Sequence, residues 1–478
     1  MRIVLINPYI KSGKLFHGFM KKIGSSLPPL GLAYIAAYLE QNNHEVIIID
    51  NRIEQLDLKS LYYKIEKFDP QIIGITSIST QLLYTIITAK FLKKKLQNVK
   101  IVVGGPHASS APIELLDYCK EIDYIIKGEG EIGFLKFIKN LNKGENLKNT
   151  PGIAYKNNHG NYINNEPIVI EDIGILPFPA RHLLPMKEYR PSLVNYNTLP
   201  SRSLITSRGC PYNCSFCSKI YTGKVRFNNE QKILEEISIL IDQYKAKELI
   251  YWDDCFTFNK NRSIKLFKVL KSNNIDIPWM SMARIDQMSK SFLIEAKKNN
   301  CWRLGFGIES GDPQILKKTN KFIDLNQAYK VIKFCKKIGI STRIFLMLGT
   351  PYESRDSIQR TIQIAKKLNP EIVQFSYFVP FPMTKDYEYI LKNYPTFDSQ
   401  YYFKDVYPDY HNLDKLVFTP EYISEKDLKK FHALAYFNYY FRFKYIIGRI
   451  KNNRTLLDLY KNLSIPFNLL NDFVKKIF

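Results

Sequence analysis

The sequence predicts an α/β protein of two units, a doubly wound N-terminal domain followed by a partial (β/α)6 barrel. Three observations predict this fold. Short apolar runs alternate with amphipathic stretches over residues 1–140, and the same alternation returns over residues 201–420. Runs that are apolar throughout are typical of parallel strands with both faces covered by helices. Residues 141–200, between the two patterns, are rich in Asn, Pro and Gly, which predicts a linker.

The N-terminal unit contains five strand-like runs, at residues 3–6, 46–49, 72–75, 101–103 and 124–126. Helical patterns lie between them, most clearly at residues 30–41 and 82–96. A doubly wound sheet binds its ligands at the carboxyl ends of its strands. We therefore expect a ligand site where these runs end.

The segments after these strands carry glycines and hydroxyl groups. Glycine lets the backbone approach a flat or bulky ligand closely, although each segment alone could also be a tight turn. We expect the following residues to line the ligand site: Leu30, Gly31, Thr76, Ser77, Ser79, Gly104, Gly105, His107, Gly128 and Glu129.

The second unit has six strand-like runs, at residues 203–207, 249–252, 279–282, 304–308, 344–348 and 372–377. Helical patterns at residues 230–243, 291–299, 327–338 and 354–368 separate them. Six such repeats fit a partial barrel, whose active site lies at the C-terminal ends of the strands. Residues 421–478 lack strand-like runs and predict a helical C-terminal extension.

Three cysteines, Cys210, Cys214 and Cys217, follow the first predicted barrel strand with the spacing Cys-x3-Cys-x2-Cys. A cubane iron–sulfur cluster is normally held by four cysteines, so three would leave one iron open. Two other interpretations are weaker. A structural zinc site would need four N or S ligands, and the loop contains no histidine. A disulfide suits neither the tight spacing nor an intracellular protein.

This loop resembles the signature of radical S-adenosylmethionine (SAM) enzymes in its spacing, in the aromatic Phe216 and in the preceding Arg208-Gly209. In that family the open iron binds SAM, and one electron splits it to give a 5′-deoxyadenosyl radical. The resemblance implies that Phe216 lies beside the adenine, and that Glu309 and Ser310 contact the ribose and carboxylate of SAM. It also implies that Asp253 and Asp254 bind the SAM amino group or face the substrate, unless they are solvated turn residues. Arg284, after the third strand, is a candidate clamp for the SAM carboxylate because such charge-assisted pairs suit Arg, with a surface Arg as the alternative.

Residues 1–140 resemble the cobalamin-binding domain that precedes many radical SAM enzymes, in the Pro-Pro-Leu-Gly run at residues 28–31 and the Gly-Glu-Gly-Glu run at residues 128–131. One motif is missing. The Asp-x-His-x-x-Gly sequence that supplies an imidazole to cobalt is absent, because His17 and Gly18 lack the Asp and the spacing. We expect cobalt without a protein imidazole below it. His107 is a candidate hydrogen-bond donor or a loop histidine near solvent.

The combined resemblance implies three cofactors, a [4Fe-4S] cluster, SAM and cobalamin. It also implies a reaction, the transfer of a methyl group through cobalamin to an unactivated carbon of a small molecule or peptide. Two alternatives remain open. One is a radical ring closure, oxidation or rearrangement without methyl transfer, as in porphyrin cyclisation. The other is a non-catalytic cobalamin or redox sensor.

Composition limits the partners. The net charge is +24, but lysines are spread along the whole chain, so we expect no nucleic-acid binding. The N-terminus does not resemble a signal peptide, and no apolar run reaches the roughly 20 residues that span a bilayer. We expect a cytoplasmic enzyme reduced by flavodoxin or ferredoxin. The aromatic residues 431–445 are expected to cap the core, with peripheral membrane contact as the alternative.

Overall fold

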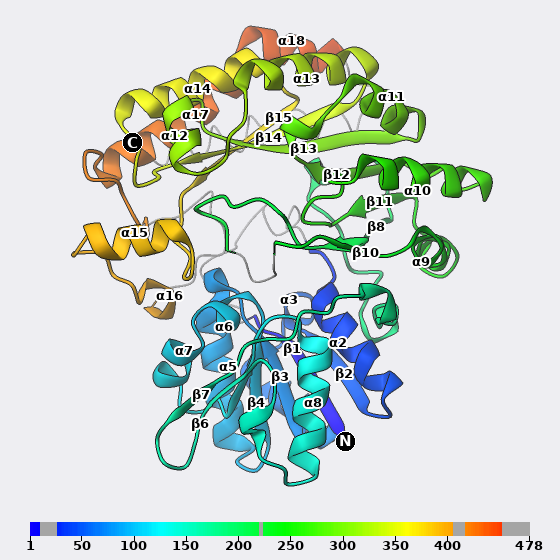
Figure 1. Cartoon of the computed structure of the whole chain (residues 1–478), viewed down its shortest axis with the longest axis vertical. Helices are drawn as coiled ribbons and strands as arrows, with labels where there is room; N and C mark the ends of the chain where they lie inside the picture. The colour runs from blue at the N-terminus through cyan, green and yellow to red at the C-terminus, as the bar shows by residue number, and fades with distance from the viewer. Residues whose placement is uncertain (10–25, 219–222, 405–415, 452–478) are drawn as a thin grey trace.

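The protein is described by a computed structural model that covers residues 1–9, 26–218, 223–404 and 416–451. His17, Gly18 and the end of the C-terminal extension lie outside these residues. Figure 1 shows two lobes, the N-terminal domain below in blue and cyan and the barrel above in green and yellow. The predicted α/β architecture of two units is confirmed.

The first sheet has the strand order β2-β1-β3-β4-β5-β6-β7. Its first five strands are parallel and match the five predicted runs. The strands are β1 (Arg2–Asn7), β2 (Glu45–Asp50), β3 (Ile72–Thr76), β4 (Lys100–Gly104), β5 (Tyr124–Ile126), β6 (Ile153–Lys156) and β7 (Tyr162–Asn164). The order reverses at β1, as in doubly wound folds that bind ligands at this point.

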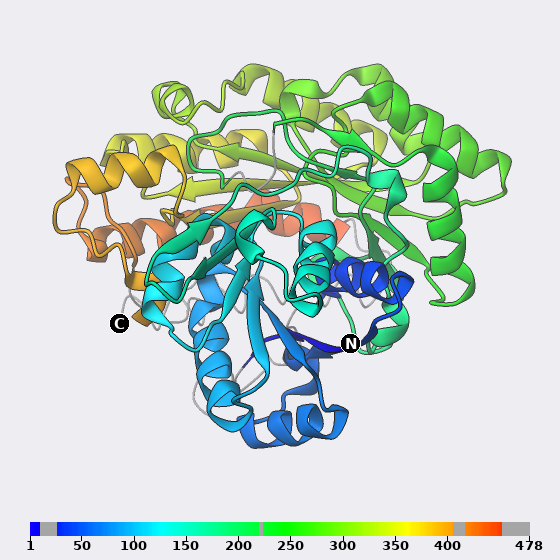
Figure 2. The same ribbon diagram turned by 60° about the horizontal axis from the view of Figure 1, so that its bottom comes forward.

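Helices cover both faces of this sheet, as Figure 2 shows. The helices are α2 (Leu30–Gln41), α3 (Asn51–Glu54), α4 (Leu58–Phe68), α5 (Leu82–Lys95), α6 (Pro106–Ser110), α7 (Pro112–Tyr118) and α8 (Gly130–Asn142). In β1, Ile3 and Leu5 pack with α2 and α8, whereas Val4 and Ile6 pack with α4 and α5. Burial on both faces explains why the strands are apolar throughout.

Two antiparallel strands, β6 and β7, extend the sheet past residue 140, where we expected a linker to begin. They were missed because β7 is short and half-exposed, so its sequence lacks the apolar run that marks a buried strand. The linker is thus shorter than predicted and begins after Asn164.

The second sheet is a six-stranded partial barrel with the order β15-β14-β13-β12-β11-β8, all parallel. Its strands are β8 (Ser201–Leu204), β11 (Glu248–Tyr251), β12 (Trp279–Ala283), β13 (Cys301–Glu309), β14 (Ser341–Leu348) and β15 (Ile372–Tyr377). The helices outside it are α9 (Glu230–Asp242), α10 (Lys260–Ser272), α11 (Lys290–Lys298), α12 (Pro313–Lys318), α13 (Leu325–Ile338) and α14 (Arg355–Leu368).

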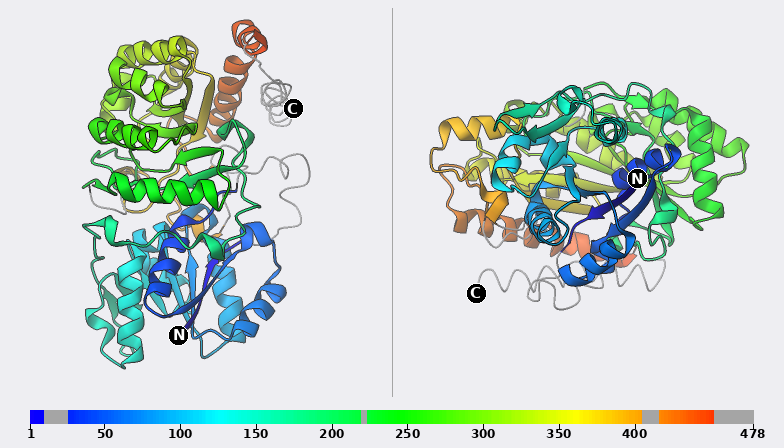
Figure 3. Two further views of the ribbon diagram at one scale, coloured as in Figure 1. Left: turned by 90° about the vertical axis from the view of Figure 1, so that its right-hand side faces the viewer. Right: turned by 90° about the horizontal axis from the view of Figure 1, so that it is seen from below.

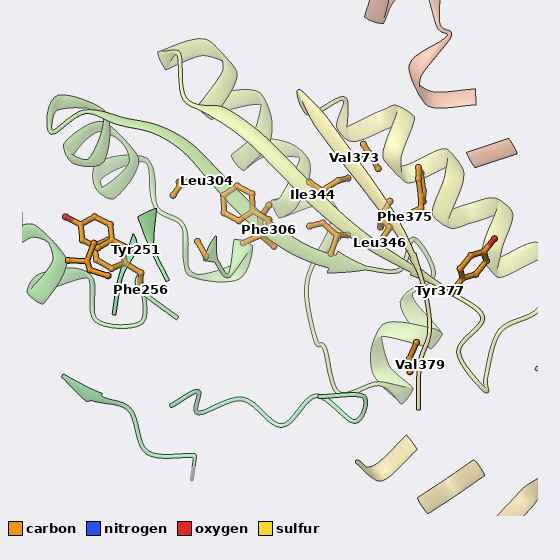
Figure 4. Packing of buried hydrophobic residues seen from close by; sticks show 14 of the residues in the cluster. Tyr251, Phe256, Leu304, Phe306, Ile344, Leu346, Val373, Phe375, Tyr377 and Val379 are labelled. Carbon is orange, nitrogen blue, oxygen red and sulfur yellow. The ribbon is translucent and has the colours of Figure 1, made fainter. Parts of the chain in front are cut away.

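Alternation along β14 separates the outside of the barrel from its interior. Ile344, Leu346 and Leu348 are buried against the helices, and Figure 4 shows the first two packed with Phe306 and Phe375. Phe345 and Met347, on the opposite face, stay partly exposed toward the interior.

The run predicted as a single strand at residues 203–207 is broken. β8 ends at Leu204, and β9 (Ser207–Arg208) pairs instead with β10 (Arg226–Phe227) in a separate two-stranded sheet. Asp253 explains the break, because it accepts hydrogen bonds from the backbone and hydroxyl of Thr206 and from the hydroxyl of Ser207.

A C-terminal helix, α17 (Glu425–Tyr440), covers the open edge of the barrel, as the left view of Figure 3 shows. The Tyr440 hydroxyl accepts from Val373 N and donates to Val373 O, and Tyr436 bridges Phe375 in the same way. These tyrosines satisfy backbone groups that an edge strand otherwise exposes.

The described residues of the C-terminal part also form α15 (Lys385–Asn393), α16 (Tyr401–Lys404) and α18 (Phe443–Lys451). The α16 helix contacts α5 of the N-terminal domain. Within the described ranges, the structure contains no helix with both the length and the apolar character needed to cross a bilayer.

Candidate functional site between the two domains

A cavity lies between the two domains. Its lower wall comes from the segments that follow β3, β4 and β5. The barrel supplies the upper wall with Ser207, Arg208, Trp252 and Asp254, which follow β8 and β11. The carboxyl edges of the two sheets therefore face each other across one space.

Six of the residues predicted to bind cobalamin line this cavity: Gly31, Thr76, Gly104, Gly105, Gly128 and Glu129. Gly105 has a φ of 95°, and a Cβ there would lie 2.8 Å from Ser77 O and from Thr76 Oγ1. Only glycine fits this close turn, which forms part of the cavity rim.

The other four predicted residues, Leu30, Ser77, Ser79 and His107, do not line the cavity. Leu30 packs with Tyr34 and Ile170. The Ser77 hydroxyl donates to Gly104 O and accepts from Ala108 N, so it joins two neighbouring segments. These side chains pack or hydrogen-bond behind the residues that line the cavity.

His107 is fully buried, so the expectation of a loop histidine near solvent is wrong. Its Nδ1 lies 3.0 Å from the Ser79 hydroxyl, and its ring packs edge-on against Tyr402 of α16, at 4.5 Å between ring centroids. Burial lowers the pKa of His107 to about 3, so the ring is neutral at physiological pH. It belongs to the contact between the two domains.

The inner part of the cavity is apolar, as expected of a site for cobalamin. Leu5, Val102, Ile126 and Phe134 line it together with Gly74. A Cβ on Gly74 would lie 2.7 Å from Leu5 Cδ2, so this glycine keeps the slot open. A glycine rim over an apolar slot suits a flat, bulky ligand with an aromatic appendage, such as cobalamin.

The cluster loop begins directly above this cavity. Asp254, a cavity residue, accepts a hydrogen bond from Gly209 N at 2.8 Å, one residue before Cys210. Cys217 N donates a hydrogen bond to Cys214 O at 3.2 Å, so these two cysteines lie on one tight turn. Cluster binding would replace their protons with iron.

The described residues contain no group of three side chains placed to hold a single metal ion. A cubane cluster would take each of the three cysteines on a different iron.

Arg284 places a positive charge beside the cluster loop. Its guanidinium lies 3.6 Å from the centroid of the Tyr212 ring, and Nη1 donates to Cys214 Sγ at 3.9 Å. Two bonds to Asp286 fix its orientation. Arg284, which we expected to contact SAM, therefore lies beside the cysteines and is held there by Asp286.

A second cavity opens into the barrel at the ends of β13, β14 and β15. Phe216 and Glu309, both predicted to contact SAM, line it together with Phe345, Met347 and Ser376. It lies beside the cluster loop because Phe216 directly precedes Cys217. Two of the predicted SAM residues thus meet at one cavity beside the cysteines.

Glu309 ends β13 at an irregularity in the pairing with β14 and has a φ of 69°. Its carboxylate pairs with the buried ammonium of Lys321 at 3.1 Å. A Cβ on Gly307 would lie 2.2 Å from Glu309 Oε1 and 3.0 Å from Lys321 Nζ. Gly307 therefore provides the space in which this ion pair forms.

Two of the predicted SAM residues have other roles. Asp253 is buried and saturated by Thr206 and Ser207, so it holds the break between β8 and β9. Ser310 is buried and hydrogen-bonded to Thr361 and to Asp312 N. Neither residue lines a described cavity, because their side chains point into the protein.

Sequence reasoning missed Lys321 and Trp252. Lys321 lies on a loop after α12, and nothing in the sequence marks it as buried. Trp252 is 49% exposed and projects into the cavity between the domains. A tryptophan directly before the Asp253-Asp254 pair was a usable signal, since a large exposed aromatic at a strand end indicates a binding surface.

Comparisons with known proteins identify the family. The family model described as the B12 binding domain matches residues 17–138, and that of the radical SAM superfamily matches residues 204–365. An uncharacterized methyltransferase of Pyrococcus horikoshii is 34% identical over 454 residues, which cover 94% of this chain and 95% of that protein.

Two further similarities agree. The anaerobic magnesium-protoporphyrin IX monomethyl ester cyclase of Rubrivivax gelatinosus is 25% identical, covering 84% of this chain and 72% of its own length. The radical SAM methyltransferase TsrM of Kitasatospora setae, solved with cobalamin and a [4Fe-4S] cluster, shares the fold. Its TM-score is 0.66 at 16% identity, over 89% of this chain and 80% of that one. The chain therefore belongs to the B12-binding radical SAM enzymes, whose cofactors are a [4Fe-4S] cluster, SAM and cobalamin.

Proposed function

We propose that this enzyme transfers a methyl group through cobalamin to an unactivated carbon of a small-molecule or peptide substrate. The observation that carries the proposal is the shared cavity at the carboxyl edges of both sheets, with the cluster loop starting at its upper wall. The methyltransferase of Pyrococcus horikoshii, similar over nearly the whole chain, supports this reaction.

The cluster with SAM supplies a 5′-deoxyadenosyl radical, and cobalamin supplies a methyl group. Cys210, Cys214 and Cys217 would hold the cluster. Phe216 would lie against the adenine, and Arg284 would offer its charge to the SAM carboxylate. Glu309 and Lys321 would orient the remaining polar groups of SAM, because both are held rigidly beside the loop.

The protein residues on the other side would position cobalamin. Gly31, Gly104, Gly105 and Gly128 provide backbone contact at the rim, and Thr76 offers a hydroxyl. Trp252 would cover the cofactor from the barrel side and exclude water from the space between the reacting groups. Flavodoxin or ferredoxin would supply the electron.

Anaerobic incubation of reconstituted protein with SAM, hydroxocobalamin and a low-potential reductant tests the proposal. We expect both 5′-deoxyadenosine and S-adenosylhomocysteine, each dependent on the cluster. The Cys214→Ala variant is the control and should form no 5′-deoxyadenosine. Formation of 5′-deoxyadenosine by this variant would contradict the assigned site.

A second candidate is a radical cyclisation, oxidation or rearrangement without methyl transfer. The similarity to the magnesium-protoporphyrin cyclase favours it. It predicts 5′-deoxyadenosine without S-adenosylhomocysteine in the same assay. A sensor with a structural cluster predicts neither product.

A further inference from the structure

Both ends of the cluster loop are bound to one carboxylate of the N-terminal domain. Arg208 precedes the loop on β9, Arg226 follows it on β10, and the two residues are paired across the small sheet. Glu129 accepts from Arg208 Nη1 at 3.0 Å through Oε1, and from Arg226 Nη1 through Oε2. One side chain thus holds the loop at its entry and its exit.

Neighbouring groups complete this network. Glu131 accepts from Arg208 Nη2 at 2.6 Å. Ile170 N donates to Glu129 Oε2, and Ile170 O accepts from Arg226. The guanidinium of Arg208 also lies over the Tyr34 ring, 5.0 Å from its centroid.

The network is buried. The side chains of Glu129 and Arg226 are each 2% exposed, that of Glu131 is 4% exposed and that of Arg208 is 12% exposed. Buried ion pairs add little net stability compared with apolar residues of similar size. They do fix orientation, because each charge accepts only a geometry that keeps it paired.

The segment that carries Glu129 also forms a wall of the cavity between the two domains, here called the cobalamin cavity. Gly128, Glu129, Gly130 and Glu131 all line that cavity, and so does Arg208. A ligand in the cavity would lie against this segment, and any shift of the segment would reach both ends of the loop through the Glu129 carboxylate. A ligand on the cluster would do the same in the opposite direction.

We propose that Glu129 is a positioning residue that couples occupancy of the cobalamin cavity to the geometry of the cluster loop, so that cobalamin and SAM each strengthen the binding of the other. The inference rests on the proposed function, since it takes both ligands to occupy these sites. Each ligand would favour one shared arrangement of residues 128–131 and the cluster loop, and this shared preference tightens the binding of each ligand in the presence of the other. Linkage requires both effects to be equal.

A matched control exists in the same protein. Arg181 and Glu236 form another buried ion pair, at 2.7 Å, with exposed fractions of 2% and 3%. Glu236 lies on α9 and lines neither described cavity, so this pair does not join the cavity to the cluster loop. Glu236→Gln should cost stability as Glu129→Gln does, without changing the coupling.

The experiment measures SAM affinity by anaerobic equilibrium dialysis of the cluster-loaded protein, with and without hydroxocobalamin and without reductant. In the wild type we expect cobalamin to tighten SAM binding by roughly fivefold or more. The ratio should fall toward one in Glu129→Gln and stay at the wild-type value in Glu236→Gln. The EPR spectrum of the reduced cluster should change on cobalamin addition in the wild type and not in Glu129→Gln.

Two results would overturn the inference: a wild-type ratio of one, or a full ratio retained in Glu129→Gln. If Glu129→Gln does not fold, Arg226→Lys carries the test, since it breaks the contact of Glu129 with the exit of the loop at a residue that lines neither described cavity. A reduced ratio in that variant supports the coupling, and an unchanged ratio overturns it. Wild-type protein that binds neither ligand contradicts the proposed function itself, whereas binding of both with a ratio of one contradicts only the coupling.

Discussion

Replacement of Tyr440 by phenylalanine tests how the open edge of the barrel is closed. Tyr440 is 1% exposed and Val373 is 2% exposed. The single hydroxyl of Tyr440 accepts from Val373 N at 3.0 Å and donates to Val373 O at 2.7 Å. Tyr440→Phe keeps the ring in place and removes both bonds.

The size of the effect follows from burial. An unsatisfied buried donor or acceptor costs about 1–3 kcal/mol, and water has no access to either backbone group in this interface. With partial relaxation of α17, we expect a loss of about 2–4 kcal/mol in the free energy of unfolding. Tyr436→Phe removes the same kind of bridge, but Phe375 O keeps a second partner in His432 Nε2 at 3.1 Å. Because one backbone group loses its partner there and not two, a smaller loss of about 1–2 kcal/mol is expected.

Urea unfolding of the anaerobic protein measures the loss, and hydrogen exchange at the Val373 amide localises it. Tyr422→Phe is the control, because Tyr422 is 76% exposed and its substitution should change stability by less than about 0.5 kcal/mol. If Tyr440→Phe loses no more stability than this control, and the Val373 amide stays protected from exchange, then Tyr440 does not bridge the edge strand. The strand matters for function because Gln374 and Ser376 of β15 line the second cavity.

Three other predictions concern residues near the site. Burial raises the pKa of Glu353 from 4.5 to about 8, so stability is full below pH 4.5 and falls as the pH rises to about 8. Glu353→Gln should remove this dependence in unfolding measurements, and an unchanged pH profile would contradict it. Asp253→Asn should lower stability by about 1–3 kcal/mol and leave SAM affinity unchanged; weaker SAM binding at unchanged stability would restore its predicted SAM contact. Cys217→Ala should lose iron after reconstitution, whereas Cys335→Ala, a buried barrel thiol, should retain it; equal iron in both would exclude Cys217 as a ligand.

Much of the fold was predictable because both sheets are parallel and covered on both faces. Ile3, Val4, Leu5 and Ile6 are all buried, two against each helical layer, so the strand appears in the sequence as an unbroken apolar run. The short edge strand β7 escaped prediction because it has no second face to bury.

The site was only partly predictable because sequence places a residue at a strand end but does not set the direction of its side chain. Asp253 and Asp254 are adjacent, yet the first points inward to Thr206 and the second reaches Gly209 N at the cavity. Glu129 was expected to bind cobalamin through its position after β5. In the structure its carboxylate pairs with Arg208 and Arg226. These residues lie 79 and 97 positions later in the chain, so no local pattern predicts the contact.

The central claim, that cobalamin and the cluster occupy opposite walls of one space, is tested most directly by anomalous diffraction at the iron and cobalt edges. The crystal should be grown anaerobically from protein reconstituted with iron, sulfide and hydroxocobalamin. We expect iron at Cys210, Cys214 and Cys217, and cobalt in the cavity bounded by Gly105, Gly128 and Trp252. Cobalt bound elsewhere, or iron absent from the three cysteines, would contradict the claim.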